Sequence, residues 1–527
     1  MALELSVPTE RAAPPKDLEL RPKQAKAWVE SLPLSQSADA GRRILANLAS
    51  INRSKVEFDD RLQLLEIYRP IAHVVLDELD AVYGKSLLPL PPRAREALAL
   101  ARELATELAY GYKILLLEKT GKFLAFGAKK QQPLLGTRAM EHLIALLRSS
   151  YRSYTPMPAG IWREIHQIYL HFEKEGLAGE PGDPETKLGV IDLYLETLLV
   201  SLTDPYRLLP GDVDKVSEVI RAAPRSATLG QARPPTSPTA HFLVPADTDK
   251  PPKPLLSAND DAGGPNWRLL DANPIVDKLR AKRQAFETGN VSATMSRAMN
   301  PEALVFLGKL VTLWGDPPKR ASRRDPMDTS VAICAGLRAI THFLGVDVQA
   351  EEAQEAAKIQ QGITIPLISV PDDDVSRGMN VNEWEVINQS AGGLKVRRVG
   401  ASTQAITVGE VVGIRFMARR RWTIGVVRWL TVLDEGGMEF GIQFLAPSAR
   451  LVALQPTISA VGQVRPGLLL AEDEGFEGSD AVLAPPATYS DLREFELEDA
   501  GLVNLVRATS LIEKTGRFEL FHIAPSS

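Results

Sequence analysis

The sequence predicts an α+β protein with several domains: a helical N-terminal part, a flexible linker, and a small antiparallel β-barrel followed by a β extension. Three observations lead to this prediction. Apolar residues first recur at helical spacing, a proline-rich stretch then interrupts the pattern, and beyond residue 380 apolar side chains recur with a period of two. The chain has 527 residues, 44% of them hydrophobic, which suffices for about two to four domains with buried cores.

Residues 38–222 carry the helical pattern. Met140, Leu143, Ile144 and Leu147 follow the i, i+3, i+4, i+7 spacing of a buried helix face. No fixed repeat period occurs, so a helix bundle and an irregular helical solenoid both remain open, and residues 1–37 are expected to form a flexible N-terminus. Because proline interrupts helices, we expect breaks near Pro70, Pro92, Pro133, the pair Pro156 and Pro158, and Pro205.

The composition changes after the helical part. Residues 223–266 contain QARPPTSPTA and PADTDKPPKP, which cannot bury enough apolar surface to become ordered, and they predict a disordered proline-rich linker. Residues 267–315 predict a helical connector, in which Trp267 could pack against the segment ALVFLGKLVTLW.

Residues 316–455 predict a small closed β-barrel. Val412, Ile414 and Phe416 alternate with polar or small residues, as in a strand with one buried face. Glycine-rich turns separate this run from similar ones, which is typical of antiparallel hairpins. Residues 456–527 contain further strand-like pieces such as GLLLA and RFELFHI, and they form either a second small β unit or an extension of the barrel.

Composition excludes several classes of protein. The formal net charge of -5 gives no overall attraction to a nucleic-acid polymer. The single cysteine, Cys334, excludes a disulfide framework and a thiolate metal cage. No leader pattern and no run of about 18 apolar residues is present, so we predict a cytoplasmic protein without membrane insertion.

The sequence offers no sign of catalysis, of a cofactor or of a metal centre. The seven histidines are dispersed, and the closest pair, His166 and His171, is not at the i, i+4 spacing that puts two ligands on one helix face. No nucleophile elbow, zinc-binding HExxH helix or dinucleotide fingerprint occurs. We therefore expect no catalytic residue, no metal ligand and no enzyme.

A basic run precedes the first predicted barrel strand. Within it Arg320 and Arg324 are four residues apart, next to two prolines and just before the strand-like SVAI. Guanidinium groups bind phosphate oxygens in bidentate fashion, pair with guanine O6 and N7, and stack on purine faces. A solvated basic loop is the alternative interpretation of this run alone.

A polar turn lies further along the chain. Asn388 ends the strand EWEVIN, Ser390 follows it, and Gly393 begins the strand GLKVRR. The side chains offer short hydrogen-bonding groups, and the glycines would permit a positive φ and the close approach of a ligand. Alone, this segment could equally be an ordinary hairpin turn.

Together the two clusters resemble the signature of PilZ domains, an Arg-x-x-x-Arg segment followed by [Asp/Asn]-x-Ser-x-x-Gly. The strands VGEVVGIRF, WTIGVVRWL and MEFGIQFL are similar to the later barrel strands of that family. The resemblance covers about residues 315–455. Because the two motifs are further apart than is usual in the family, we interpret about 345–380 as an insertion between two barrel strands.

This resemblance implies a receptor for the bacterial second messenger cyclic di-GMP. The receptor would transmit the level of its ligand to an unknown protein partner through the helical region. A PilZ-like adaptor or scaffold that binds no ligand is the alternative. The resemblance assigns Arg320 and Arg324 to phosphate and guanine contacts, Asn388, Ser390 and Gly393 to the guanine pocket, and Lys319 and Arg323 to auxiliary contacts.

Overall fold

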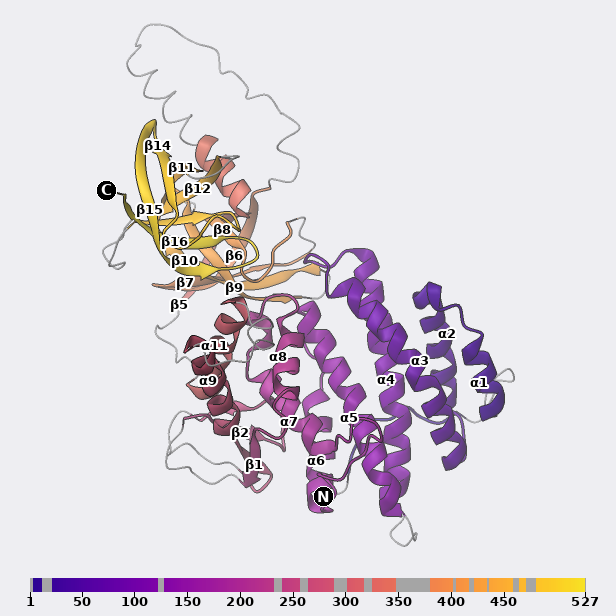
Figure 1. The fold of residues 1–527 in the computed structure, drawn as a ribbon. Helices are drawn as coiled ribbons and strands as arrows, with labels where there is room; N and C mark the ends of the chain where they lie inside the picture. Colours follow the sequence, from indigo (N-terminus) through magenta and orange to yellow (C-terminus); the bar gives the residue numbers. More distant parts are fainter. Residues whose placement is uncertain are drawn as a thin grey trace. The chain divides into compact units, whose positions relative to one another are not determined.

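The computed structural model divides the chain into two compact units. Unit 1 comprises Met1–Ser86 and Leu90–Lys319, and unit 2 comprises Leu87–Pro89 and Arg320–Ser527. Both units are drawn in Figure 1. The structure describes residues 3–11, 21–121, 128–231, 239–255, 264–288, 301–316, 325–346, 380–400, 404–416, 421–433, 436–457, 464–470 and 480–526.

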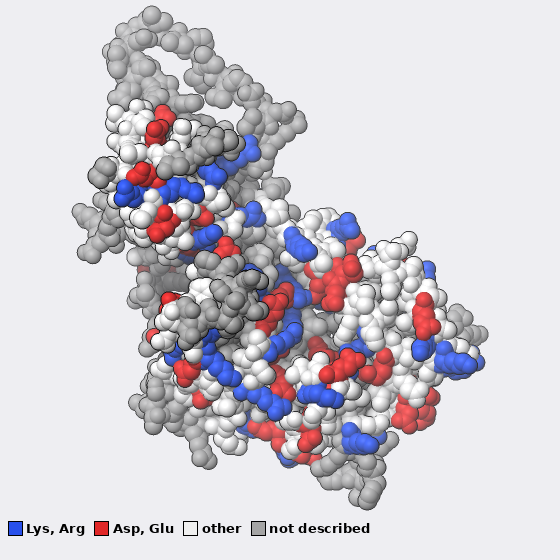
Figure 2. All heavy atoms as spheres, in the orientation of Figure 1, with Lys and Arg blue, Asp and Glu red and all other residues white. Residues whose placement is uncertain are grey.

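Unit 1 is built mainly from helices, as the apolar spacing predicts (Figure 1). Charged side chains of both signs are interspersed over the face of this unit that Figure 2 shows, as on an ordinary solvated helical surface. The helices of its first part are α1 (Pro22–Glu30), α2 (Ser37–Asn52), α3 (Phe58–Tyr83), α4 (Pro92–Gly121), α5 (Ala128–Ser153), α6 (Ile161–Lys174), α7 (Val190–Ser201) and α8 (Asp212–Arg221), with short 3-10 turns at Leu34–Gln36 and Pro205–Arg207.

Helices α3, α4 and α5 pack side by side around a leucine- and alanine-rich core. Leu104, Leu108 and Leu115 of α4 are fully buried, and their spacing keeps them on one side of the helix. Two glycines permit close helix contacts. A Cβ at Gly111 would lie 2.5 Å from Leu65 Cδ2, and one at Gly136 would lie 2.2 Å from Cζ of Phe172.

Two of the expected helix breaks are wrong. Pro70 lies inside α3 and Pro133 lies inside α5. A proline in a helix removes one backbone hydrogen bond and costs about 3 kcal/mol. In α3 the buried side chains continue on both sides of Pro70, from Leu64 and Leu65 to Ala72 and Val75, and their burial outweighs that cost.

The N-terminus is more ordered than predicted. Leu5 is buried, and the backbone N–H of Ser6 donates to Glu164 Oε1 of α6 at 2.8 Å. The N–H of Arg11 donates to the carbonyl of Arg53 at 2.7 Å, and α1 follows within the range expected to be flexible. A single apolar side chain and a few backbone hydrogen bonds are too weak a pattern to recognise in sequence, which explains the error.

The prediction of a disordered linker over 223–266 is also wrong for its described residues. Phe242, Leu243 and Val244 are buried in a four-stranded sheet, and Trp267 begins a strand instead of a helix. Proline and serine dominate the average composition, but this short apolar run decides the fold. The sheet order is β1-β4-β2-β3, from β1 (Thr228–Gln231), β2 (His241–Pro245), β3 (Lys253–Pro254) and β4 (Trp267–Asp271).

The sheet and the two helices after it belong to unit 1. The carbonyl of Lys250 accepts from His166 Nε2 of α6 at 2.9 Å, and Asp249 accepts from the N–H of Gly160 at 2.6 Å. The connector helices are α9 (Asn273–Glu287) and α11 (Pro301–Gly315). Trp314 of α11 is fully buried and donates from Nε1 to the carbonyl of Leu199 at 3.0 Å.

Unit 2 begins with a closed six-stranded antiparallel barrel. The buried rings of Trp384 and Phe440 meet edge to face inside it, with centroids 4.7 Å apart. A helix over residues 337–346 follows its first strand. The strand order is β10-β7-β6-β5-β8-β9, from β5 (Asp325–Ala335), β6 (Asn382–Ser390), β7 (Gly393–Arg398), β8 (Val411–Phe416), β9 (Thr423–Val432) and β10 (Met438–Ala446).

The last part of the chain forms a second closed barrel. One apolar cluster joins the two barrels: it contains Trp422 of the first barrel, Ile340 of the 337–346 helix, and Leu468 and Phe518 of the second. Arg428 Nη2 also donates to Glu513 Oε2 at 2.8 Å. The strand order is β11-β12-β13-β16-β15-β14, from β11 (Ala449–Pro456), β12 (Arg465–Leu470), β13 (Ala481–Ala484), β14 (Glu494–Asp499), β15 (Leu502–Lys514) and β16 (Glu519–Pro525).

Candidate functional site

The polar motif forms the connection between β6 and β7, where Ser390 pairs with Gly393. Neither Gly392 nor Gly393 has the positive φ expected from the sequence. Gly393 is required for a different reason: a Cβ there would lie 2.0 Å from the carbonyl oxygen of Ile442 in β10. The glycine lets β10 lie directly against the turn, while Gly392 faces open space.

A β-bulge decides the direction of the Asn388 side chain. Trp384 and Val386 point into the barrel core and are buried, so strict alternation would also send residue 388 inward. The pairing of β6 with β7 shifts between Val386 and Asn388, which makes Ile387 the extra residue. Asn388 therefore pairs with Lys395, whereas Val386 pairs with the buried Val396. The bulge places Asn388 on the outer face of the barrel.

Asn388 has an unused acceptor. Its Oδ1 is buried and has no hydrogen-bond partner within the described residues. Leaving such an atom unsatisfied costs about 1–3 kcal/mol, and sites of this kind commonly receive a water or a ligand donor. Nearby, the hydroxyl of Ser390 donates to the carbonyl of Gly393 at 3.3 Å, a long bond that a better partner could replace.

Strand register brings the start of β5 to this turn. Asp325 pairs with Gln389, and Pro326 pairs with Asn388, with a second irregularity before Thr329. Arg324 directly precedes Asp325 in the sequence. The four cationic residues of the prediction, Lys319, Arg320, Arg323 and Arg324, lie outside the described residues.

Three further residues, none of them among the predicted site residues, continue the row that starts at Asn388. Asn388 pairs with Lys395, Lys395 with Gly441, and Gly441 with Trp429, across strands β6, β7, β10 and β9. Gly441 leaves room for the Trp429 ring, because a Cβ there would lie 2.0 Å from Trp429 Nε1. Lys395 Nζ lies 5.6 Å from the centroid of that ring and 2.6 Å from Glu439 Oε1.

This row was hidden in the sequence because two bulges disturb the alternation. The pairing of β9 with β10 shifts between Gly441 and Ile442, so Trp429 does not follow the parity of Trp422, Ile424 and Val426. A glycine facing a tryptophan across a strand pair is a recognisable signal only once the register is known.

A cavity of about 260 Å³ opens elsewhere, in unit 1. Asp77, Asp80 and Asp214 line it together with Arg152, which forms ion pairs with Asp80 and Asp214. Burial is the largest influence on Asp80 and raises its pKa. The cavity contains none of the predicted site residues.

The first barrel with its Asn-x-Ser-x-x-Gly turn has the features of the PilZ class, and comparison with protein families agrees. The family model for the middle PilZ domain of the cyclic-di-GMP receptor FimW matches residues 241–362 and 345–450. Residues 241–450 therefore belong to the PilZ domain family. The matched region starts before β5 and includes part of the range that the sequence suggested was a linker.

The N-terminal part of this chain is also similar to a domain of FimW. The family model for the N-terminal domain of the cyclic-di-GMP receptor FimW matches residues 23–235. Among curated proteins, the cyclic-di-GMP receptor FimW of Pseudomonas aeruginosa is 24% identical over 507 residues, which cover 86% of this chain and 82% of FimW. The similarity thus extends over the helical unit and the PilZ barrel together.

No helix in the described part of the chain combines the length and the apolar character needed to cross a membrane.

Proposed function

We propose that this protein is a cyclic di-GMP receptor and that the ligand binds on the outer face of the first barrel, beside the β6–β7 turn. The similarity to a named cyclic-di-GMP receptor supports the choice of ligand. The proposed position of the ligand rests on the Oδ1 atom of Asn388, which is buried and has no hydrogen-bond partner within the described residues. Asn388 lies on β6, which pairs with β5, the strand that follows the basic run in the sequence. Guanine presents N–H donors that fit this acceptor.

The proposed roles follow from chemistry and chain length. Asn388, Ser390 and Gly393 would form the guanine pocket. Arg320 and Arg324 would contact phosphate and guanine, with Lys319 and Arg323 as auxiliary cations. Arg320 is five residues before Asp325. An extended backbone of that length covers at most about 18 Å, so both arginines remain within reach of the turn.

The neighbouring row on the barrel supplies a surface for a planar base. Trp429 offers an aromatic face, and Lys395 adds a positive charge beside it. Glu439 pairs with both Lys395 and Arg397, at 2.6 Å and 2.7 Å, and keeps this face from carrying a large excess of positive charge. A doubly charged ligand therefore needs the arginines of the basic run for neutralisation.

We further propose that ligand binding orders the arginine segment against the barrel, and that this step changes how a protein partner meets the helical unit. The ligand can drive such a change only through contacts that differ between the two states, and phosphate–arginine pairs supply them. On this view the protein acts by binding and not by catalysis.

Calorimetric titration of the full-length protein with cyclic di-GMP tests the proposal. Arg320→Ala and Arg324→Ala should each abolish detectable heat while leaving the far-UV circular dichroism unchanged, because a loop arginine contributes little to a barrel core. Arg42→Ala is the matched control, since this exposed arginine of α2 pairs only with Asp39 of its own helix turn among the described residues. Wild-type affinity in both the Arg320→Ala and the Arg324→Ala variants would remove the site assignment.

An adaptor that binds no nucleotide is the second candidate function. The observation that favours it is the exposure of Leu502, Val503 and Leu505 at the start of β15, because clustered apolar side chains on a surface often mark a protein-binding site. Absence of heat with wild-type protein at high micromolar cyclic di-GMP would favour this candidate over the receptor.

A further inference from the structure

Three potential metal ligands meet between two helices of unit 1. His73 lies on α3, and Glu141 and His142 lie on α5. A ring nitrogen of each histidine and a carboxylate oxygen of Glu141 all lie within 4.8 Å of one another. The two histidines are far apart in sequence, so no ligand spacing indicates the cluster, and no metal ligand was expected from the sequence.

His142 is the observation that points to a ligand. Its side chain is about 1% exposed, and neither ring nitrogen has a hydrogen-bond partner among the described residues. A buried polar group without a partner costs about 1–3 kcal/mol, which native structures rarely tolerate without a bound water, an ion or a function. Its ring stacks on Tyr112 at 5.7 Å between centroids and meets His73 at 5.4 Å, so it is held in place without using its nitrogens.

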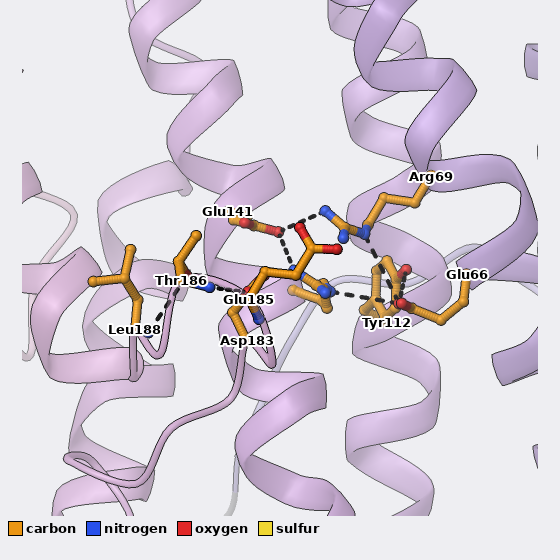
Figure 3. Close-up of polar contacts among 9 residues, drawn as sticks. Glu66, Arg69, Tyr112, Glu141, Asp183, Glu185, Thr186 and Leu188 are labelled. Atoms are coloured by element: carbon orange, nitrogen blue, oxygen red, sulfur yellow. Dashed lines mark hydrogen bonds and ion pairs between the residues drawn. The ribbon is translucent and has the colours of Figure 1, made fainter.

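Charged residues around the cluster fix the carboxylate. Glu141 Oε2 lies 3.6 Å from Arg69 Nη1 and 3.2 Å from Arg138 Nη1. Arg138 in turn pairs with Asp183 at 2.5 Å. Figure 3 shows Glu141 beside Arg69 and Glu66 beside Tyr112, with the Asp183 loop next to them. Partners of this kind orient a ligating carboxylate and are a regular part of metal centres.

The charge balance admits a cation. Two guanidinium groups, Arg69 and Arg138, face three carboxylates, Glu66, Glu141 and Asp183. Leaving the imidazoles aside, the fixed charges give 2 − 3 = −1. A divalent ion would therefore enter surroundings that are not positively charged, in spite of the two arginines.

We propose that His73, Glu141 and His142 bind a divalent transition-metal ion of the zinc class that stabilises the contact between α3 and α5. Two imidazoles with one carboxylate suit Zn²⁺, whereas Ca²⁺ and Mg²⁺ prefer oxygen ligands throughout. Zn²⁺ binds such atoms at about 2.0–2.2 Å, which brings them to about 3.3 Å from one another. Rotation of the half-buried His73 and Glu141 side chains toward His142 supplies this contraction.

Metal content and cobalt spectroscopy of the full-length protein test the proposal. After treatment with a chelator, the protein is equilibrated with micromolar Zn²⁺ and the bound metal is measured by mass spectrometry. We expect one zinc ion per chain at this site. Replacement by Co²⁺ should give visible d–d bands typical of a site with few ligands and mixed nitrogen and oxygen donors. Thermal unfolding should also move to a higher temperature with Zn²⁺.

The variants His73→Gln and His142→Gln should bind more than about 100-fold more weakly and lose the cobalt bands. His241→Gln is the control. His241 of β2 lies 3.9 Å from a carboxylate oxygen of Asp271, but it does not belong to the group formed by His73, Glu141 and His142. If the buried His142 variant does not fold, the half-buried His73 variant decides alone. Wild-type protein without zinc, or a doubly substituted His73 and His142 variant that binds like wild type, would show that the cluster is only a packed set of rings.

Discussion

At the scale of single residues, Asn388 can offer a guanine one acceptor and a pair of donors, whereas an aspartate there would offer two acceptors. We expect Asn388→Asp to bind cyclic di-GMP more tightly than wild type, since two guanine N–H groups would then find an acceptor. Asn388→Ala and Ser390→Ala should each lose about 1 kcal/mol, about fivefold in affinity.

Calorimetry on the three variants and the wild type measures this order. Gln389→Ala is a suitable control, because residue 389 pairs with the buried Leu394 and not with Lys395. An unchanged affinity in both the aspartate and the alanine variants of Asn388 would mean that this side chain does not meet the base.

A buried histidine makes unit 1 sensitive to acid. His166 is buried, with Nε2 donating to the carbonyl of Lys250 at 2.9 Å and Nδ1 lying 2.6 Å from the hydroxyl of Tyr194. Burial is the largest influence and lowers its pKa to about 4. In the unfolded chain this histidine has a pKa of about 6.5, so between about pH 6.5 and 4 it binds a proton that the folded chain does not bind.

Stability should therefore be constant above about pH 6.5 and fall by up to about 3 kcal/mol as the pH is lowered to about 4. Urea unfolding at several pH values tests this, with His166→Gln compared to wild type. The variant should show a shallower fall in that range. Because His73 also has a lowered pKa and titrates in the same direction, only the difference between the two proteins counts; equal slopes would contradict the prediction.

At the scale of the elements, the crossing of α5 over α6 depends on a missing side chain. Gly136→Ala would place a methyl group 2.2 Å from the Phe172 ring. We expect a loss of about 1–3 kcal/mol in the free energy of unfolding, in spite of the better helix propensity of alanine. The midpoint of urea unfolding measures it. Gly179→Ala is the control, because a Cβ there meets nothing within 4 Å; a loss of the same size in both would contradict the packing argument.

The type of most elements could be predicted, but not all of their details. Periods of 3.6 and of two residues distinguish helices from strands over long segments such as α4 and β10. The helix breaks predicted at Pro70 and Pro133 were wrong, because burial of the helix in the core outweighs the local tendency of proline to end a helix. The bulge at Ile387 has no sequence signature, since it depends on the pairing of β6 with β7. The motif residues of the turn could be named, whereas the row from Lys395 to Trp429 could not.

At the scale of the whole molecule, the two barrels share an apolar cluster, and we expect them to unfold as one cooperative body. Phe518 of the second barrel belongs to that cluster, while Phe495 belongs to a cluster confined to the second barrel. We expect Phe518→Ala and Phe495→Ala each to cost about 3–5 kcal/mol. Only Phe518→Ala should also lower hydrogen-exchange protection in β8 and β9 of the first barrel. Equal protection of those strands in both variants would mean that the barrels unfold independently.

Domain organisation was the hardest property to predict. The sequence left open whether residues 456–527 form a second β unit or an extension, and closure of the second barrel depends on strands far apart in the chain, such as β11 and β14. The range 223–266 appeared unstructured by composition, yet a few buried residues of β2 anchor a sheet there. The other boundaries proposed from the sequence, the cytoplasmic location and the partner of the helical unit remain predictions.

The extra residue in β6 has a consequence for how this protein can vary. Removing Ile387 would remove the bulge and leave Asn388 opposite Lys395 and Ser390 opposite Gly393, so both side chains would keep their outward direction. Deleting a second residue would shift the register by one and put either the motif residues or Trp384 on the wrong face of the strand. Deletion of Ile387 alone should therefore be tolerated, whereas any further deletion between Trp384 and Gly393 should not. Among homologous chains, the number of residues in that interval should vary by the one bulge residue at most, even where their identities differ.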